Sequence, residues 1–313
     1  MLIAGLIMHK RCFFLTISIF WLPVTVIAGG SHADNDNNAE IEMEIDYFNI
    51  GSSKSNTANS EMATSGVMFE SQYEKNNTTF SFGYERWNYR WTNPENLPFG
   101  SGVARDPWGP FTTLQFGFAY EQEPRKNWEL RYYLEAESSY EKEMSNSYEY
   151  EAGIDFNYEP SHNWSYTLNV NLEYLDADGA ELGVDFEIEW NHHAKEGWSG
   201  EFEISSEFPE SLLRYHFTKE FATAVYYGEG GTNTIRLSDN STLPGLKGAY
   251  LEDEYTTFGL RLDYEFAPEQ LLSFSLQKNT GRQLSFSGPK GGTEKIYKFD
   301  DSTEFLVKYS HSF

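Results

Sequence analysis

The chain lacks most of the features that hold or anchor an ordinary secreted protein. It has a single cysteine, Cys12, so no disulfide can form within it. Lys and Arg number 23 against 48 Asp and Glu, which gives a formal charge of −25 at pH 7. Each phosphate contact needs a cation on the protein, so this imbalance argues strongly against nucleic-acid binding. It also excludes a peripheral protein that basic residues hold on anionic lipid.

Long apolar runs are missing after the first 33 residues. The apolar stretch 13–28 follows Lys10-Arg11 and precedes the small-residue site Ser31-His32-Ala33. It is shorter than the roughly 20 residues that a transmembrane helix needs, and the order of its parts is that of a secretory signal peptide. We therefore predict a signal peptide over residues 1–33, whose removal brings the charge to −25 − 2 = −27.

The remainder of the chain contains alternating apolar and polar residues. In residues 164–174 every even position is apolar and every odd position is polar. A strand points successive side chains to opposite faces, so such a segment has one apolar and one polar face. Similar segments follow one another from residue 40, joined alternately by tight turns and by longer loops, among them 91–110 and 229–252. We count 14 strands, and an even number places both ends of a bacterial barrel on the same side.

The last of these strands ends on an aromatic residue. Phe305, Val307, Tyr309, His311 and Phe313 lie on one face of the strand. This pattern resembles the terminal strand of bacterial outer-membrane β-barrels, which their insertion machinery reads. His311 departs from it, because those proteins usually carry an apolar residue there. The resemblance implies that Tyr309 and Phe313 form the assembly signal.

Short motifs add a second resemblance. Tyr89-Arg90-Trp91, Leu97-Pro98-Phe99-Gly100 and Asp106-Pro107-Trp108 lie in or beside one long loop, and Leu213-Arg214-Tyr215 precedes a loop with Gly-Gly-Thr. These motifs are similar to those of a Gram-negative outer-membrane barrel family of unknown function. The resemblance runs over most of the chain after the signal peptide. It implies a barrel and no particular activity.

Together these patterns predict an all-β protein with one antiparallel transmembrane β-barrel over residues 40–313. We expect about 14 strands, with 12–16 possible, short periplasmic turns and long extracellular loops. Residues 34–39 would be a short periplasmic tether. The alternative is a soluble β-sandwich with aromatic strand ends. A barrel of this kind would lie in the outer membrane of a Gram-negative bacterium, with membrane lipid, lipopolysaccharide and the barrel-assembly machinery as its partners.

Aromatic residues recur where strands meet tight turns. Three tryptophans each open a strand directly after a turn, and three further aromatic residues each close the strand before it. Amphipathic rings favour the headgroup level of a membrane, so we predict a periplasmic aromatic girdle. Its members are Tyr120, Trp128, Tyr158, Trp164, Trp190 and Trp198.

Carboxylates dominate the faces that must then point into the barrel. Between residues 128 and 203, Arg131 is the only basic residue at the inward positions. A dry interior cannot hold so many unpaired charges, whereas a wide barrel leaves an aqueous channel. The interior is therefore expected to be wet and negative. The predicted pore-lining residues are Glu135, Glu151, Asp155, Asp185, Glu187 and Glu203.

An acidic wall of this kind favours a passive, cation-favouring channel for small hydrophilic or cationic solutes. The alternative is a barrel sealed by the loops 91–110 and 229–252, with a structural, adhesive or recognition role.

Few residues have a catalytic pattern. His192-His193 fall in a predicted turn without ligand spacing to another His or Cys, so no metal site is predicted. His216 lies near Ser and Glu residues, but no nucleophile motif accompanies it, and a barrel hydrolase is a remote alternative. We therefore predict no enzyme, no catalytic residue and no cofactor.

Overall fold

The computed structural model of the chain describes residues 39–97, 99, 106–176, 179–205, 209–232, 234–241, 243–288 and 295–313. The predicted signal peptide and residues 34–38 of the predicted tether lie outside these ranges.

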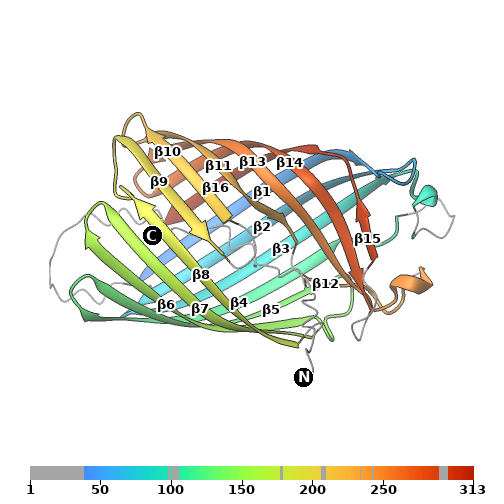
Figure 1. Cartoon of the computed structure of the whole chain (residues 1–313), viewed down its shortest axis with the longest axis horizontal. Coiled ribbons are helices and arrows are strands. Elements are labelled where there is room, and N and C mark those ends of the chain that lie inside the picture. The colour runs from blue at the N-terminus through green and yellow to red at the C-terminus, as the bar shows by residue number, and fades with distance from the viewer. Residues whose placement is uncertain are drawn as a thin grey trace, which may run out of the picture.

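Fourteen antiparallel strands form a closed barrel, as the alternation predicts (Figure 1). Its strands are β1 (Glu40–Lys54), β2 (Glu61–Lys75), β3 (Thr78–Thr92), β4 (Phe111–Arg125), β5 (Trp128–Tyr140), β6 (Tyr148–Ser161), β7 (Trp164–Leu175), β8 (Gly179–Trp190), β9 (Gly197–Ile204), β10 (Pro209–His216), β11 (Phe221–Gly231), β13 (Tyr250–Ala267), β14 (Gln270–Ser287) and β16 (Ser302–Ser312). Four short elements lie between them: η1 (Pro94–Asn96), β12 (Ile235–Arg236), η2 (Pro244–Leu246) and β15 (Lys295–Lys298).

The first and last strands close the barrel. β1 pairs with β16 from Glu42 opposite Ser312 to Ile50 opposite Glu304. Beyond the strand, the backbones of Ile41 and Phe313 exchange hydrogen bonds in both directions. Closure leaves no open sheet edge, and this is the condition that a β-structure must meet to cross lipid.

The connections differ sharply between the two ends of the barrel. At the end that holds Phe313 the turns are tight; Asn76 and Asn77 join β2 to β3 with φ of 50° and 62°. A two-residue hairpin turn of this type needs positive φ at both positions, which asparagine tolerates. Longer loops with η1 and η2 occupy the opposite end (Figure 1). Short turns are periplasmic in bacterial barrels, so we call the two ends periplasmic and extracellular.

Apolar side chains cover the outer surface. Leu134 is 59% exposed, Leu182 66% and Leu276 58%, each beside a more buried inward neighbour. So much exposed apolar surface fits a wall in contact with lipid. No helix among the described residues is long and apolar enough to span a membrane.

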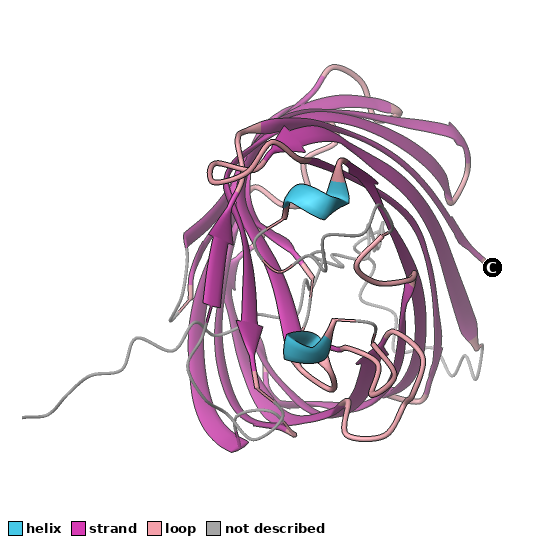
Figure 2. Cartoon of the chain, turned by 90° about the vertical axis from the view of Figure 1, so that its right-hand side faces the viewer, coloured by secondary structure: helices cyan, strands magenta, loops and turns pink. Residues whose placement is uncertain are grey.

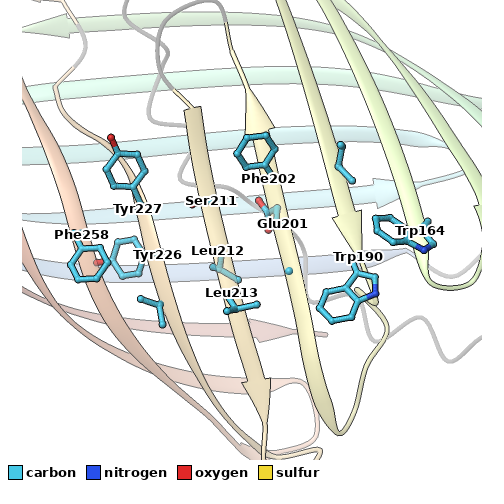
Figure 3. Close-up of a pocket in the computed structure, with 13 residues that line it drawn as sticks. Trp164, Trp190, Glu201, Phe202, Ser211, Leu212, Leu213, Tyr226, Tyr227 and Phe258 are labelled. Atoms are coloured by element: carbon cyan, nitrogen blue, oxygen red, sulfur yellow. The ribbon is translucent and has the colours of Figure 1, made fainter.

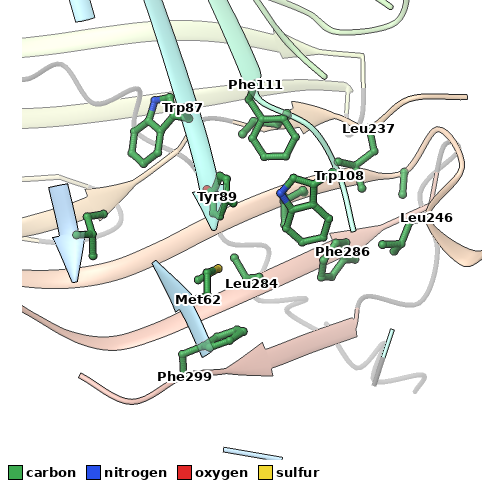
Figure 4. Close-up of a cluster of buried hydrophobic side chains, with 14 of the residues drawn as sticks. Met62, Trp87, Tyr89, Trp108, Phe111, Leu237, Leu246, Leu284, Phe286 and Phe299 are labelled. Atoms are coloured by element: carbon green, nitrogen blue, oxygen red, sulfur yellow. The ribbon is translucent and has the colours of Figure 1, made fainter. Parts of the chain in front are cut away.

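A buried apolar cluster fills part of the extracellular end (Figure 4), and we call it the loop core. Its members come from the inner faces of β1–β4, β13 and β14 and from the connections β3–β4, β11–β13 and β14–β16. In Figure 2, which looks into this end, η1 and η2 lie within the outline of the barrel mouth. The buried members are Phe48, Ile50, Met62, Met68, Trp87, Tyr89, Trp108, Phe111, Ile235, Leu237, Leu243, Leu246, Ala249, Leu251, Tyr255, Leu284, Phe286 and Phe299.

The β11–β13 loop also reaches across to β5. Arg236 forms a parallel bridge with Tyr140, and the backbone N–H of Glu141 donates to the carbonyl of Arg236 at 2.9 Å. The hydroxyl of Tyr250 donates to the carbonyl of Asn146 in the β5–β6 loop at 2.8 Å. The described loops therefore narrow the extracellular mouth, an arrangement that the loop-sealed alternative expects.

Candidate functional site: the acidic interior wall

The six carboxylates predicted to line a pore lie on the inward face of β5, β6, β8 and β9. Their side chains are half-buried or buried, whereas the outward neighbours Leu134, Val184 and Phe202 are 59%, 47% and 43% exposed. The period-2 argument thus placed these residues on the correct face. Whether they line an ion path stays a prediction.

The part of the wall on β5 and β6 is held by hydrogen bonds. Gln115 donates to Glu135 at 3.0 Å and Tyr133 donates to Glu151 at 2.6 Å. Asp155 accepts from Arg131 at 3.0 Å and from Asn169 at 2.6 Å. Glu135 and Glu151, which form no ion pair in this network, therefore accept hydrogen bonds from neutral donors instead.

The part of the wall on β8 and β9 is a denser acidic group. Glu187 lies opposite Glu203 in the strand register, and Glu189 lies opposite Glu201. Carboxylate oxygens of Glu187, Glu189 and Glu201 all lie within 4.8 Å of one another. Sequence analysis placed Glu187 and Glu203 inward, but the register is needed to show that the four residues form two facing pairs.

Basic residues face the interior on β10, β13 and β16. Asp263 on β13 holds Arg214 at 3.5 Å and Arg261 at 3.0 Å, and Lys308 on β16 lies 2.6 Å from Glu44. The interior is therefore acidic along β5–β9 and mixed along β10–β16. The same period-2 rule applied to β10, β13 and β16 would have found these cations.

The residues of the predicted girdle point outward near the periplasmic turns. Trp128 stacks on Tyr158, with ring centroids 4.6 Å apart, and Trp164 lies opposite Trp190 in the register. Trp198 is 49% exposed. Their level in a membrane stays a prediction.

The predicted assembly residues lie at the barrel seam. Tyr309 is paired with Ile45 on one side and Leu272 on the other. Phe313 is 60% exposed, and the His311 ring packs edge-on against it at 3.9 Å. His311, the residue that departs from the terminal-strand pattern, is thus in contact with the aromatic ring of Phe313.

Sequence reasoning missed a cluster of three histidines at the periplasmic turns. His162 stacks on His193 at 4.6 Å between ring centroids, and His193 lies 3.9 Å from His192. Burial and the two neighbouring imidazoles lower the pKa of His192 to about 4. The sequence placed His162 and His192-His193 in two neighbouring hairpin turns, and adjacent hairpins of a barrel bring their turns together.

The only group of three potential metal ligands that converge within the described ranges is the glutamate group on β8 and β9.

A serine and a histidine also meet inside the barrel. Ser199 Oγ lies 3.2 Å from Nε2 of His216. In the part of the chain that the structure describes, His216 has no hydrogen bond to a carboxylate, the third member of a triad. Asp263, which lies near enough to act on it electrostatically, is bonded to Arg261 and Ser273 instead.

A hollow lies in the outer wall over β7–β11 and β13 (Figure 3). Trp190, Phe202, Leu213 and Phe258 line it with apolar surface, and Gly200 adds no side chain. Most of these side chains point outward, so the hollow faces the lipid side, and Glu201 of the acidic wall also contributes to its lining.

No protein-family model and no curated protein matches the chain. Among solved structures, a mutant of the TodX monoaromatic hydrocarbon channel matches with a TM-score of 0.47 and 11% identity over 89% of this chain and 91% of that one. An outer-membrane channel from Pseudomonas putida F1 matches with 0.42 and 11% over 91% and 98%. The NanC porin matches with 0.39 and 10% over 85% and 98%. These likenesses extend to the barrel alone, and the solutes of those proteins have no bearing on this chain.

Proposed function

We propose that the protein is a passive outer-membrane channel that favours small hydrophilic cations. The observation that carries this proposal is the acidic inner wall of β5–β9, in which Arg131 is the one basic side chain at the inward positions between residues 128 and 203. A carboxylate in a dry interior costs several kcal/mol unless it is paired. A wall of this composition is therefore stable when water reaches it.

Selection would come from the potential of the wall. Rows of carboxylates concentrate cations and repel anions, and salt screens the effect. Energy coupling and a cofactor have no role in this proposal. The channel would work in the outer membrane of a Gram-negative bacterium, in contact with membrane lipid and lipopolysaccharide, after insertion by the barrel-assembly machinery.

The loop core controls access in this proposal. It occupies part of the extracellular end, whereas the periplasmic end has tight turns. Current through the intact protein should therefore be small, and shortening the β11–β13 loop should increase it.

The test is conductance in planar bilayers with a KCl gradient. Replacing Glu135, Glu151, Asp155, Asp185, Glu187 and Glu203 by Gln or Asn should move the reversal potential toward the non-selective value. The matched control replaces six exposed carboxylates at strand ends and in turns, and should leave the potential unchanged. These are Glu40, Glu74, Glu123, Glu196, Glu269 and Asp300. Anion preference before mutation would overturn the proposal.

A second candidate is a loop-sealed barrel with a structural, adhesive or recognition role. The bridge between Arg236 and Tyr140 across the mouth favours it. The same bilayers separate the two functions, because a sealed barrel with its loops intact would pass no current, whereas the channel would pass a small cation-favouring current.

A further inference from the structure

We propose that Glu187, Glu189, Glu201 and Glu203 form a Ca²⁺-binding site on the inner wall of β8 and β9. The site would exist whether or not the barrel conducts, so it does not depend on the proposed channel function.

The strand register supplies the geometry. Facing residues on neighbouring strands have Cβ atoms about 4.5–5.5 Å apart on the same face. Here two such pairs follow one another, Glu187 with Glu203 and Glu189 with Glu201. Ca²⁺ holds its oxygen ligands at about 2.3–2.6 Å, so two ligand oxygens on one ion are roughly 5 Å apart or closer. The 4.8 Å limit met by Glu187, Glu189 and Glu201 satisfies that condition.

The chain itself does not neutralise these charges. Like charges directly opposite one another destabilise a sheet. None of the four glutamates forms an ion pair within the described ranges. Arg214 and Arg261 act on Glu201 from a distance, but both contact Asp263.

An unpartnered buried oxygen points independently to a ligand. Glu203 is only 6% exposed, and its Oε2 has no hydrogen-bond partner; Oε1 of the facing Glu187 has none either. A buried carboxylate oxygen without a partner is rare in proteins and calls for a water or an ion. The inward carboxylates of β5 and β6 accept hydrogen bonds from side chains of the protein itself, such as Gln115 and Tyr133. On β8 and β9 a bound cation would take their place.

The ligand set selects the ion. Four carboxylates offer up to eight oxygens, which suits the six to eight oxygen ligands and flexible geometry of Ca²⁺. Mg²⁺ demands a near-ideal octahedron and keeps several waters, so it should bind more weakly. The group contains no His or Cys, the ligands that transition metals prefer. Glu189 and Glu201 lie beside the β8–β9 turn, so the ion would enter from the periplasmic end.

Calorimetric titration of CaCl₂ into the folded barrel in chelator-treated detergent tests the site. The intact protein should show saturable binding at one site, and the E187Q/E201Q variant should bind at least about tenfold more weakly. This variant removes like charges, so it should fold. The matched control is E135Q/E151Q, whose glutamates lie on the same wall with donors of their own, and it should bind as the intact protein does.

A thermal readout accompanies the titration. A ligand that binds only the folded state raises the unfolding temperature, so Ca²⁺ should stabilise the intact barrel and the control but not E187Q/E201Q. Mg²⁺ at equal concentration should give a smaller shift. Absence of saturable binding, or equal weakening in the control, would overturn the proposal in favour of diffuse charge attraction. Because these experiments measure no current, their failure is distinguishable from failure of the channel proposal.

Discussion

Arg282 on β14 and Asp253 on β13 form an ion pair whose two side chains are completely buried within the barrel. The same guanidinium donates to Thr64 on β2 at 2.7 Å, and Tyr89 on β3 donates to Asp253 at 2.9 Å. The guanidinium also lies 5.5 Å from the ring centroid of Tyr255. This group therefore joins strands from opposite ends of the sequence inside the extracellular half.

Replacing Arg282 by Met should destabilise the barrel by roughly 3–5 kcal/mol, because Asp253 is left buried without its charge partner. The measurement is urea unfolding of the barrel in lipid vesicles, followed by tryptophan fluorescence. The double variant R282M/D253L removes both charges and should recover most of the loss. If the single variant unfolds as the intact protein does, the pair contributes little to the free energy of unfolding.

A disulfide should lock the loop across the mouth. Arg236 and Tyr140 are facing residues of a β-bridge, a spacing at which paired cysteines can be joined. The R236C/Y140C variant should conduct less when oxidised than when reduced, because the loop can then no longer leave β5. The variants R236C and Y140C, each with a single cysteine, are the control. If the conductance of the double variant does not change with reductant, the idea that the β11–β13 loop moves away from β5 is contradicted.

The histidine cluster should make the periplasmic turn sensitive to acid. The pKa of His192 falls from 6.5 to about 4 in the folded protein, so the unfolded turn binds more protons between these values. The contribution of neutral His192 to the free energy of unfolding is complete above pH 6.5 and is lost as the pH falls toward 4. Histidine resonances in micelles report it directly. Substituting His162 by Ala should move the titration of His192 upward, whereas Lys195→Ala in the same turn should not.

Removal of Phe313 should impair assembly. The residue contributes two backbone hydrogen bonds with Ile41 at the seam and an exposed aromatic ring. We expect less heat-modifiable, folded protein in outer-membrane fractions. Deletion of Ala58, a single residue of the β1–β2 loop, is the control. Equal yields of the two deletions would argue against Phe313 as an assembly signal.

The alternation of apolar and polar residues made the barrel predictable from the sequence, whereas the packing of the loops was not predictable. Residues 164–174 show their two faces in the sequence because strand side chains have a period of two, and the same rule placed Glu187 and Glu203 inward. The loop core has no such period. Trp108 and Phe286 pack together at 5.8 Å between ring centroids although nine of the fourteen barrel strands, β4–β11 and β13, lie between them in sequence. Contacts of that kind depend on the closed structure.

The loop core also has a consequence for biogenesis. Its apolar residues come from the first four strands, from β13 and β14 and from three connections, the last of which holds Phe299, so the complete core cannot form before nearly all of the chain is in place. Contacts between distant parts of a sequence are slow to form. Extracellular loops must cross the membrane before they can pack at its outer side. We therefore expect Trp108, Leu237 and Phe286 to stay unpacked until insertion is nearly complete, which makes packing of the loop core a late step of maturation.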